Sequence, residues 1–185
     1  MTTPYSVKKR PSCEWQWAAD NGCFSNRWQS DQWLKWLSSI PNTSSALFAT
    51  VPDVVCDYRA TLFRWSLYWQ QVKELGFKTA FVLQDDATLK TMPINDMDVL
   101  FIGGSTEYKL SREAREIVEH CQNLGKWIHM GRVNTKGRIQ IAYEWGCDSV
   151  DGTFLAFAPD ANTERLIRYM KAGTQPQLFD LTDND

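Results

Sequence analysis

The sequence predicts an α/β protein built on a parallel sheet. Short apolar runs alternate along the chain with amphipathic stretches, which is the pattern of repeated strand–helix units. Polar residues or glycines directly follow these apolar runs. No repeat and no low-complexity linker separates the units, so we expect one domain over 1–172, followed by a mobile acidic tail over 173–185.

The expected elements follow from these runs in chain order. Strands are expected at 17–19, 46–51, 79–83, 98–102, 126–130 and 148–150. Helices are expected at 30–38, 59–75, 111–124, 135–145 and 162–171. About six units are present, whereas a complete eight-unit barrel takes roughly 250 residues. The 185-residue chain therefore favours a compact, stripped-down (β/α) TIM-like barrel with parallel strands, or an open sheet.

Composition narrows the functional classes. A formal net charge of -2 argues against a protein that coats nucleic acid, although a local basic patch remains compatible with it. The five cysteines form no C-x-x-C pair, and with two histidines they offer no set of zinc ligands. We expect no metal, no cofactor and free thiols in a reducing compartment. With no signal peptide or membrane span in view, a cytoplasmic location is predicted, in the host cytoplasm if a phage encodes the chain.

Polar residues and glycines gather where the strands are expected to end. They are Asp20, Asp53, Gln84, Gly103 with Gly104, Gly131 after Met130, and Asp151 with Gly152. Each alone is an ordinary turn residue. Because the carboxyl ends of parallel strands meet at one edge of a sheet, we expect these residues to surround a single pocket.

Six segments carry a resemblance to a known family. They are Ala19-Asp20-Asn21-Gly22-Cys23-Phe24-Ser25, Val51-Pro52-Asp53, Phe81-Val82-Leu83-Gln84-Asp85, Phe101-Ile102-Gly103-Gly104, Trp127-Ile128-His129-Met130-Gly131 and Gly146-Cys147-Asp148-Ser149-Val150-Asp151. In this order they resemble the motifs of the tRNA-guanine transglycosylase superfamily. That family's C-terminal zinc motif and RNA-binding appendage have no counterpart in this sequence. The chain is most similar to the minimal, phage-type branch that inserts 7-deazaguanines into DNA.

The resemblance implies a catalytic pair. Asp151 corresponds to the family's nucleophile and Asp20 to its general acid/base. This division of labour suits base exchange, because one carboxylate can hold the sugar covalently at C1′ while the other carries the proton of the purine. The two carboxylates then need environments that separate their pKa values.

The resemblance also implies a set of base-binding residues. Asp53, with Asp57 in reserve, would accept from the N1 and N2 donors of guanine, and Gln84 would donate to O6. Phe24 and Met130 would sandwich the ring. Backbone groups of the loops would complete the contact, at Gly103, Gly104 and Gly131.

Three basic residues follow the fifth expected strand. Arg132, Lys136 and Arg138 are candidates to bind the phosphates that flank the target base, although a solvated helix start is an equal interpretation. The expected partners are nucleic acid, DNA rather than tRNA, and a 7-deazaguanine base such as preQ0. No membrane partner is expected, and the oligomeric state stays open.

Two other functions remain open on the sequence. The chain could be a glycosidase or transferase that acts on free nucleosides, which its short length and near-neutral charge would suit. It could also be a module that binds a base or nucleotide without chemistry. A converging Asp20 and Asp151 would favour an enzyme. We interpret His129, which lies inside an apolar strand, as a core residue without a catalytic role.

Overall fold

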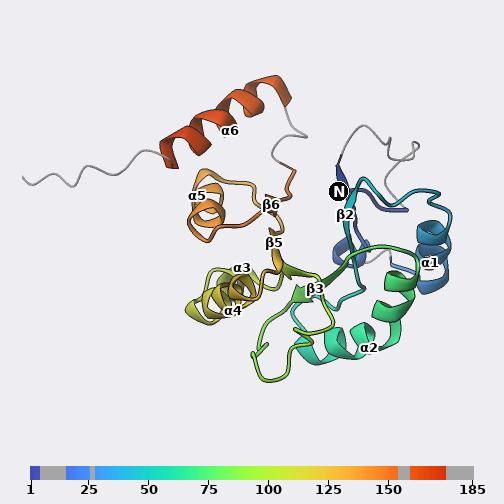
Figure 1. Ribbon diagram of the computed structural model, residues 1–185. Helices are drawn as coiled ribbons and strands as arrows, with labels where there is room; N and C mark the ends of the chain where they lie inside the picture. The colour runs from blue at the N-terminus through green and yellow to red at the C-terminus, as the bar shows by residue number, and fades with distance from the viewer. Residues whose placement is uncertain (5–15, 26–27, 154–158, 174–185) are drawn as a thin grey trace, which may run out of the picture.

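The computed structural model describes residues 1–4, 16–25, 28–153 and 159–173. These residues contain one parallel sheet whose strand order is β1-β2-β3-β4-β5-β6. The strands are β1 (Trp17–Ala19), β2 (Ala46–Thr50), β3 (Thr79–Leu83), β4 (Val99–Ile102), β5 (Trp127–Met130) and β6 (Ser149–Val150). Each strand pairs with the next along the chain, and the sheet curls into a half-barrel (Figure 1). The predicted α/β class is confirmed, and the shape is compatible with an incomplete TIM-like barrel.

Helices line the outside of this half-barrel (Figure 1). They are the 3-10 turn η1 (Cys23–Ser25) and the helices α1 (Ser30–Ser38), α2 (Tyr58–Glu74), α3 (Thr106–Lys109), α4 (Arg112–Asn123), α5 (Lys136–Glu144) and α6 (Pro159–Gly173). Side-chain caps fix four of the described helix starts, because Asp57, Ser105, Ser111 and Thr135 accept from the backbone of α2, α3, α4 and α5. The acidic segment 174–185 lies outside the described residues.

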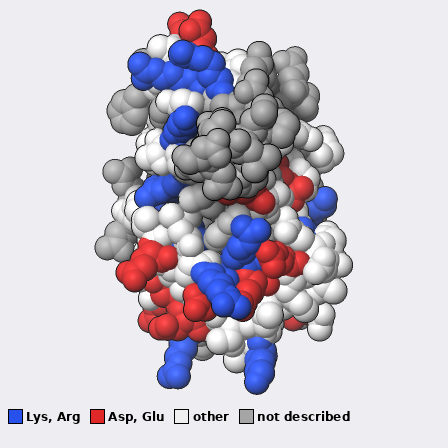
Figure 2. Space-filling model, turned by 90° about the vertical axis from the view of Figure 1, so that its left-hand side faces the viewer, with Lys and Arg blue, Asp and Glu red and all other residues white. Residues whose placement is uncertain are grey.

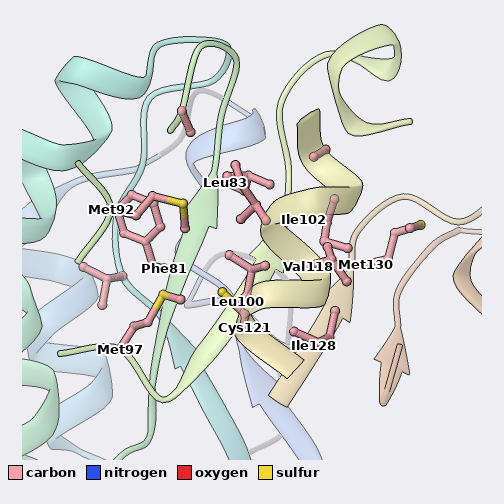
Figure 3. Close-up of a cluster of buried hydrophobic side chains, with 14 of the residues drawn as sticks. Phe81, Leu83, Met92, Met97, Leu100, Ile102, Val118, Cys121, Ile128 and Met130 are labelled. Atoms are coloured by element: carbon pink, nitrogen blue, oxygen red, sulfur yellow. The ribbon is translucent and has the colours of Figure 1, made fainter. Parts of the chain in front are cut away.

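The connection from β3 to β4 departs from the strand–helix pattern. Within this described stretch no helix intervenes, and the chain returns through turns. Met92 and Met97 from this loop are buried beside Phe81 (Figure 3). Flexible, unbranched side chains suit such an irregular space. The loop thus closes the core where a helix would otherwise pack.

The strand alternation divides the core into two layers. Leu100 and Ile102 of β4 and Met130 of β5 lie in the large cluster between sheet and helices, together with Cys121 of α4 (Figure 3). Side chains on a strand alternate between faces. The neighbouring strand positions therefore point to the inner side of the half-barrel.

Aromatic rings fill part of that inner side. Phe48 belongs to a smaller buried cluster against which Phe101 packs, and the two rings meet edge to face with centroids 6.5 Å apart. The His129 ring lies 5.1 Å from Phe48 and 4.6 Å from Phe101. This packing fixes the plane of the imidazole next to the end of β6.

The described surface carries charges of both signs. Figure 2 shows basic and acidic side chains interspersed over one face of the molecule. On α4, Arg112 pairs with Glu116 at 2.9 Å and Arg115 with Glu119 at 2.8 Å. Exposed pairs of this kind contribute roughly 0.5 kcal/mol each or less.

Among the described helices, none has the length and apolarity needed to cross a membrane.

Candidate active site at the carboxyl ends of the strands

A cavity of about 580 Å³ opens at the carboxyl ends of the strands. The predicted residues that line it are Asp20, Phe24, Asp53, Gln84, Gly103, Gly104, Arg132, Arg138 and Asp151. They come from the ends of all six strands and from the loops that follow. The sequence expectation that these ends converge on one pocket agrees with this placement.

Asp53 lies at the centre of a rigid polar network on the β1–β3 side. Asn21 Nδ2 donates to Asp53 Oδ1 at 2.8 Å, and Gln84 Nε2 donates to Asp53 Oδ2 at 2.7 Å. Asn21 also donates to the carbonyl of Val51, and Gln84 Oε1 accepts from the backbone of Cys56. With all of these groups paired, the floor of the cavity is fixed before any ligand arrives.

The surroundings of Asp53 shift the pKa of its carboxyl group. Burial raises the pKa of Asp53, and the nearby charge of Asp20 raises it further, while the hydrogen bond from Asn21 opposes both. Each carboxylate oxygen retains a second lone pair beyond its amide donor. Asp53 can therefore still accept an N–H group from a ligand inside the cavity.

Asp151 lies on the opposite, β6 side in a different environment. Its Oδ2 is 3.1 Å from His129 Nε2, and its Oδ1 accepts from the backbone N–H of Arg132 at 2.9 Å. Burial alone would raise the pKa of Asp151, but these two hydrogen bonds outweigh it and lower the pKa. Asp151 is thus held as a carboxylate at neutral pH, which a nucleophile requires.

A hydrogen-bond chain behind Asp151 orients His129. Trp127 Nε1 donates to Ser149 Oγ at 2.9 Å, and Ser149 Oγ lies 2.8 Å from His129 Nδ1. Since the indole N–H can only donate, the serine hydroxyl is free to donate onward to Nδ1. With Ser149 donating to Nδ1, Nε2 of the imidazole carries a proton that is directed at Asp151.

Asp20 is the second carboxyl group of the cavity, and its pKa shifts in the opposite direction to that of Asp151. Burial raises its pKa, a hydrogen bond from the Gly22 N–H at 3.2 Å opposes that effect, and the charge of Asp151 raises the pKa again. Two carboxyl groups that face one cavity, one biased toward the acid and one toward the anion, form the arrangement used for acid and nucleophile. The geometry can therefore support proton transfer beside a nucleophilic carboxylate.

Cations gather next to Asp151. Arg132 and Arg138 line the cavity, and the ammonium group of Lys109, only 2% exposed, donates to the Gly131 carbonyl at 2.5 Å. Burial lowers the pKa of Lys109 to about 8, and the two arginines add to the effect. Such a buried, shifted lysine beside a pocket is typical of functional sites.

Four predicted residues lie away from the cavity wall. Asp57 is exposed and caps α2, where it accepts from Ala60 N. Met130 is fully buried on the helix side of the sheet, because its strand position alternates with that of His129. Lys136 is exposed at the start of α5. The structure therefore does not bring Asp57 and Met130 to the base-binding position that the resemblance implies. Lys136, a candidate for the flanking phosphates, lies outside the cavity lining.

The fourth, Gly131, acts through its small size. A Cβ there would lie 2.6 Å from Phe101 Cε1, and Asp151 Oδ2 is 3.6 Å from the same point. Gly103 is equally constrained, since its Cβ would lie 2.6 Å from Val82 Cγ1. Both glycines let the strand ends approach one another closely around the cavity.

Sequence reasoning missed three residues of the site. His129 was interpreted as a core residue, and the structure shows it both packed in the core and bonded to Asp151. The available signal was a set of side chains with hydrogen-bonding groups at alternate positions. These are positions 127 and 129 in β5, and positions 149 and 151 in β6 and directly after it. Asn21 and Lys109 gave no comparable signal, because each acts through contacts with residues distant in the sequence.

Comparison with known proteins adds no relative. No model of a known protein family matches the chain, and a search of curated proteins finds no similar sequence. Within the described ranges, no group of three or more His, Cys, Asp or Glu side chains is placed to hold a metal ion.

Proposed function

We propose that the protein is a base-exchange transglycosylase that replaces guanine in nucleic acid with a 7-deazaguanine through a covalent aspartyl–sugar intermediate. The observation that supports it most is the pair Asp20 and Asp151, two half-buried carboxyl groups at one cavity whose pKa values shift in opposite directions. A module that only binds a base has no need of such a pair.

The reaction would proceed in two displacements. A carboxylate oxygen of Asp151 attacks C1′, the bond from C1′ to the base nitrogen breaks, and protonated Asp20 gives its proton to the departing guanine. Asp20, now ionised, takes a proton from the incoming base, whose ring nitrogen attacks C1′ and releases Asp151. Two inversions restore the original configuration at C1′.

The floor of the cavity suits the guanine edge. The free lone pairs of Asp53 can accept the N1 and N2 protons, and the second hydrogen of Gln84 Nε2 can donate to O6. Phe24, which is 66% exposed at the cavity rim, offers one ring face. Since Met130 lies elsewhere, the apolar side chains of Val82 and Phe101 in the cavity lining are the candidates for the other face.

The base must leave its stack to reach this depth. Arg138 at the cavity rim and Lys136 on the adjacent helix are the groups we assign to the flanking phosphates. We favour DNA over tRNA because the six motifs are most similar to those of the branch that inserts 7-deazaguanines into DNA. The incoming base is assigned as a 7-deazaguanine such as preQ0.

One observation favours a second function. The interspersed charges in Figure 2 provide no extended basic surface on that face, and a nucleoside fits a cavity of about 580 Å³. A glycosidase or transferase that acts on free nucleosides would use the same two carboxylates. The two functions differ only in whether a polymer is the substrate.

Exchange of labelled guanine or preQ0 into single-stranded DNA, double-stranded DNA and tRNA tests the proposal. Asp151→Asn keeps the size of the side chain and removes its charge, so exchange should fall by about 10⁴-fold or more, with nucleic-acid affinity within a few-fold. Asp20→Asn should slow both departure and entry of the base. Asp31→Asn, an exposed aspartate at the start of α1, is the matched control.

Three outcomes would decide between the functions. Wild-type exchange retained by Asp151→Asn contradicts the assigned nucleophile. Activity on nucleosides without exchange in any polymer favours the second function. Tight binding of free purines with no chemistry on either substrate favours a binding module.

A further inference from the structure

Arg132 occupies an unusual place in the cavity. It follows Gly131 at the end of β5, and its backbone adopts a left-handed conformation with φ 60°, which non-glycine residues seldom adopt. Its N–H donates to Asp151, and its carbonyl accepts from Arg138 at 3.1 Å. The backbone is therefore held on both sides, and the side chain is directed across the cavity rim.

The guanidinium group of Arg132 joins two distant loops. Its central carbon lies 4.6 Å from the centroid of the Phe24 ring, which comes from the loop after β1. One of its N–H groups donates to the carbonyl of Gly104, in the loop after β4. Phe24, Gly104 and Arg132 all line the cavity. The side chain thus fills a slot defined by an aromatic face and a carbonyl acceptor.

The chemistry of that slot matches the group that fills it. A guanidinium is a flat fork of N–H donors that stacks on aromatic rings. In guanine, C2 with N1, N2 and N3 forms the same flat guanidine fragment, and N1 and N2 carry its donors. An aromatic ring together with a carbonyl acceptor would hold either one.

We propose that Arg132 is an internal stand-in for the base, whose guanidinium occupies the slot between Phe24 and the Gly104 carbonyl until a guanidine-bearing base displaces it. The identity of that base rests on the proposed function, whereas occupation of the slot does not. Arg132 then sets the affinity of the site, because the ligand has to compete with a tethered group.

Displacement of the Arg132 guanidinium by a base has a second consequence. The freed guanidinium leaves the slot on a backbone that is still anchored beside Arg138. Two arginines at the rim would then be available for a phosphate next to the target base. Entry of a base in a polymer and binding of its phosphate are thereby coupled, which a free base cannot exploit.

Loss of the side chain should change two affinities in opposite directions. Arg132→Ala should bind labelled free guanine about tenfold more tightly in equilibrium dialysis, as expected when a competitor fills the slot about nine-tenths of the time. The same variant should bind guanine-containing DNA more weakly, since one cation is lost. Lys90→Ala, at an exposed position outside the cavity lining, is the control and should leave both affinities unchanged.

A probe that does not depend on the proposed function is methylguanidinium. Arg132→Ala should bind it about tenfold more tightly than the wild type in an NMR titration, and adding Phe24→Leu to Arg132→Ala should abolish the binding. If Arg132→Ala binds neither methylguanidinium nor guanine more tightly than the wild type, the proposal that Arg132 occupies the slot is wrong, even if guanine exchange occurs. If Arg132→Ala binds methylguanidinium more tightly but neither the wild type nor any variant exchanges guanine, Arg132 does occupy the slot and the transglycosylase proposal fails.

Discussion

Asp53 and Asp151 face the same cavity, are both largely buried, and have pKa values shifted in opposite directions. Asp53 accepts from two neutral amides, those of Asn21 and Gln84, and lies near the charge of Asp20. Asp151 accepts from an imidazole and a backbone N–H. Burial favours the neutral acid at both positions, so the neighbouring groups decide the direction. The β2–β3 side thereby suits recognition and the β6 side suits chemistry.

Removing the imidazole from the β6 side should have the largest effect on the difference between Asp53 and Asp151. In His129→Phe the aromatic packing with Phe48 and Phe101 is kept, and the hydrogen bond to Asp151 is lost. We expect kcat to fall by about 10²-fold, because His129 Nε2 positions Asp151 and stabilises the charge that returns to its carboxylate as it leaves C1′, as a donor does for a developing oxyanion. KM should change little, because His129 does not line the cavity.

The pH profile gives the same variant a second readout. The hydrogen bond from His129 lowers the pKa of Asp151, so its loss should raise that pKa. Activity, which needs the carboxylate, should then fall at a higher pH on the acid side of the profile than in the wild type. An acid limb that stays in place would show that His129 has only a packing role.

A smaller effect is expected on the recognition side. Asn21→Leu removes one donor from Asp53, which raises the pKa of that carboxyl and loosens the floor of the cavity. We expect KM for the base to rise about tenfold, with kcat changed less. Thermal unfolding serves as the control for folding. A loss confined to kcat would contradict the division between recognition and chemistry.

The smallest expected effect concerns stability and Lys109. Its pKa is lowered to about 8 in the folded protein, below the ordinary value of 10.5. Between these two pH values the unfolded chain binds a proton that the folded chain does not, so this group makes stability rise as pH increases from about 8 to 10.5. Its stabilising contribution is lost as pH falls through about 8.

Urea midpoints at pH 7, 8, 9 and 10 check this sign. In Lys109→Met the rise should vanish, and stability at pH 7 should equal or exceed that of the wild type, because the cost of a buried charge is removed. Lys90→Met, at an exposed position, is the control. An identical pH dependence for Lys109→Met and the wild type would mean that Lys109 is not buried as a cation.

The fold could be predicted largely from periodicity. The expected strand at 79–83 matches β3, and the expected helix at 111–124 encloses α4 with Ser111 as its cap. The loop from β3 to β4 gave no sign of its role, because Met92 and Met97 fill the core through tertiary contacts. Most of the strand-end residues line the cavity as expected, whereas Met130 and Gly131 do not.

The site was predicted less completely, for a geometric reason. The motif placed Met130 against the base, whereas strand alternation turns it to the helix side and turns His129 inward. Asp57 was a reserve for base binding, and its carboxylate caps α2 instead. Residues that act through a neighbour, such as Asn21 on Asp53, depend on distances that the sequence does not contain.

The central claim is a covalent bond between Asp151 and the sugar, and intact mass spectrometry tests it most directly. Wild-type protein quenched in acid after incubation with a guanine-containing oligonucleotide, without an incoming base, should gain the mass of the oligonucleotide less guanine. Peptide mapping should place the adduct on Asp151, and Asp151→Asn should show none. An adduct on another residue, or guanine exchange by the wild type with no adduct and full retention of activity in Asp151→Asn, would contradict the account.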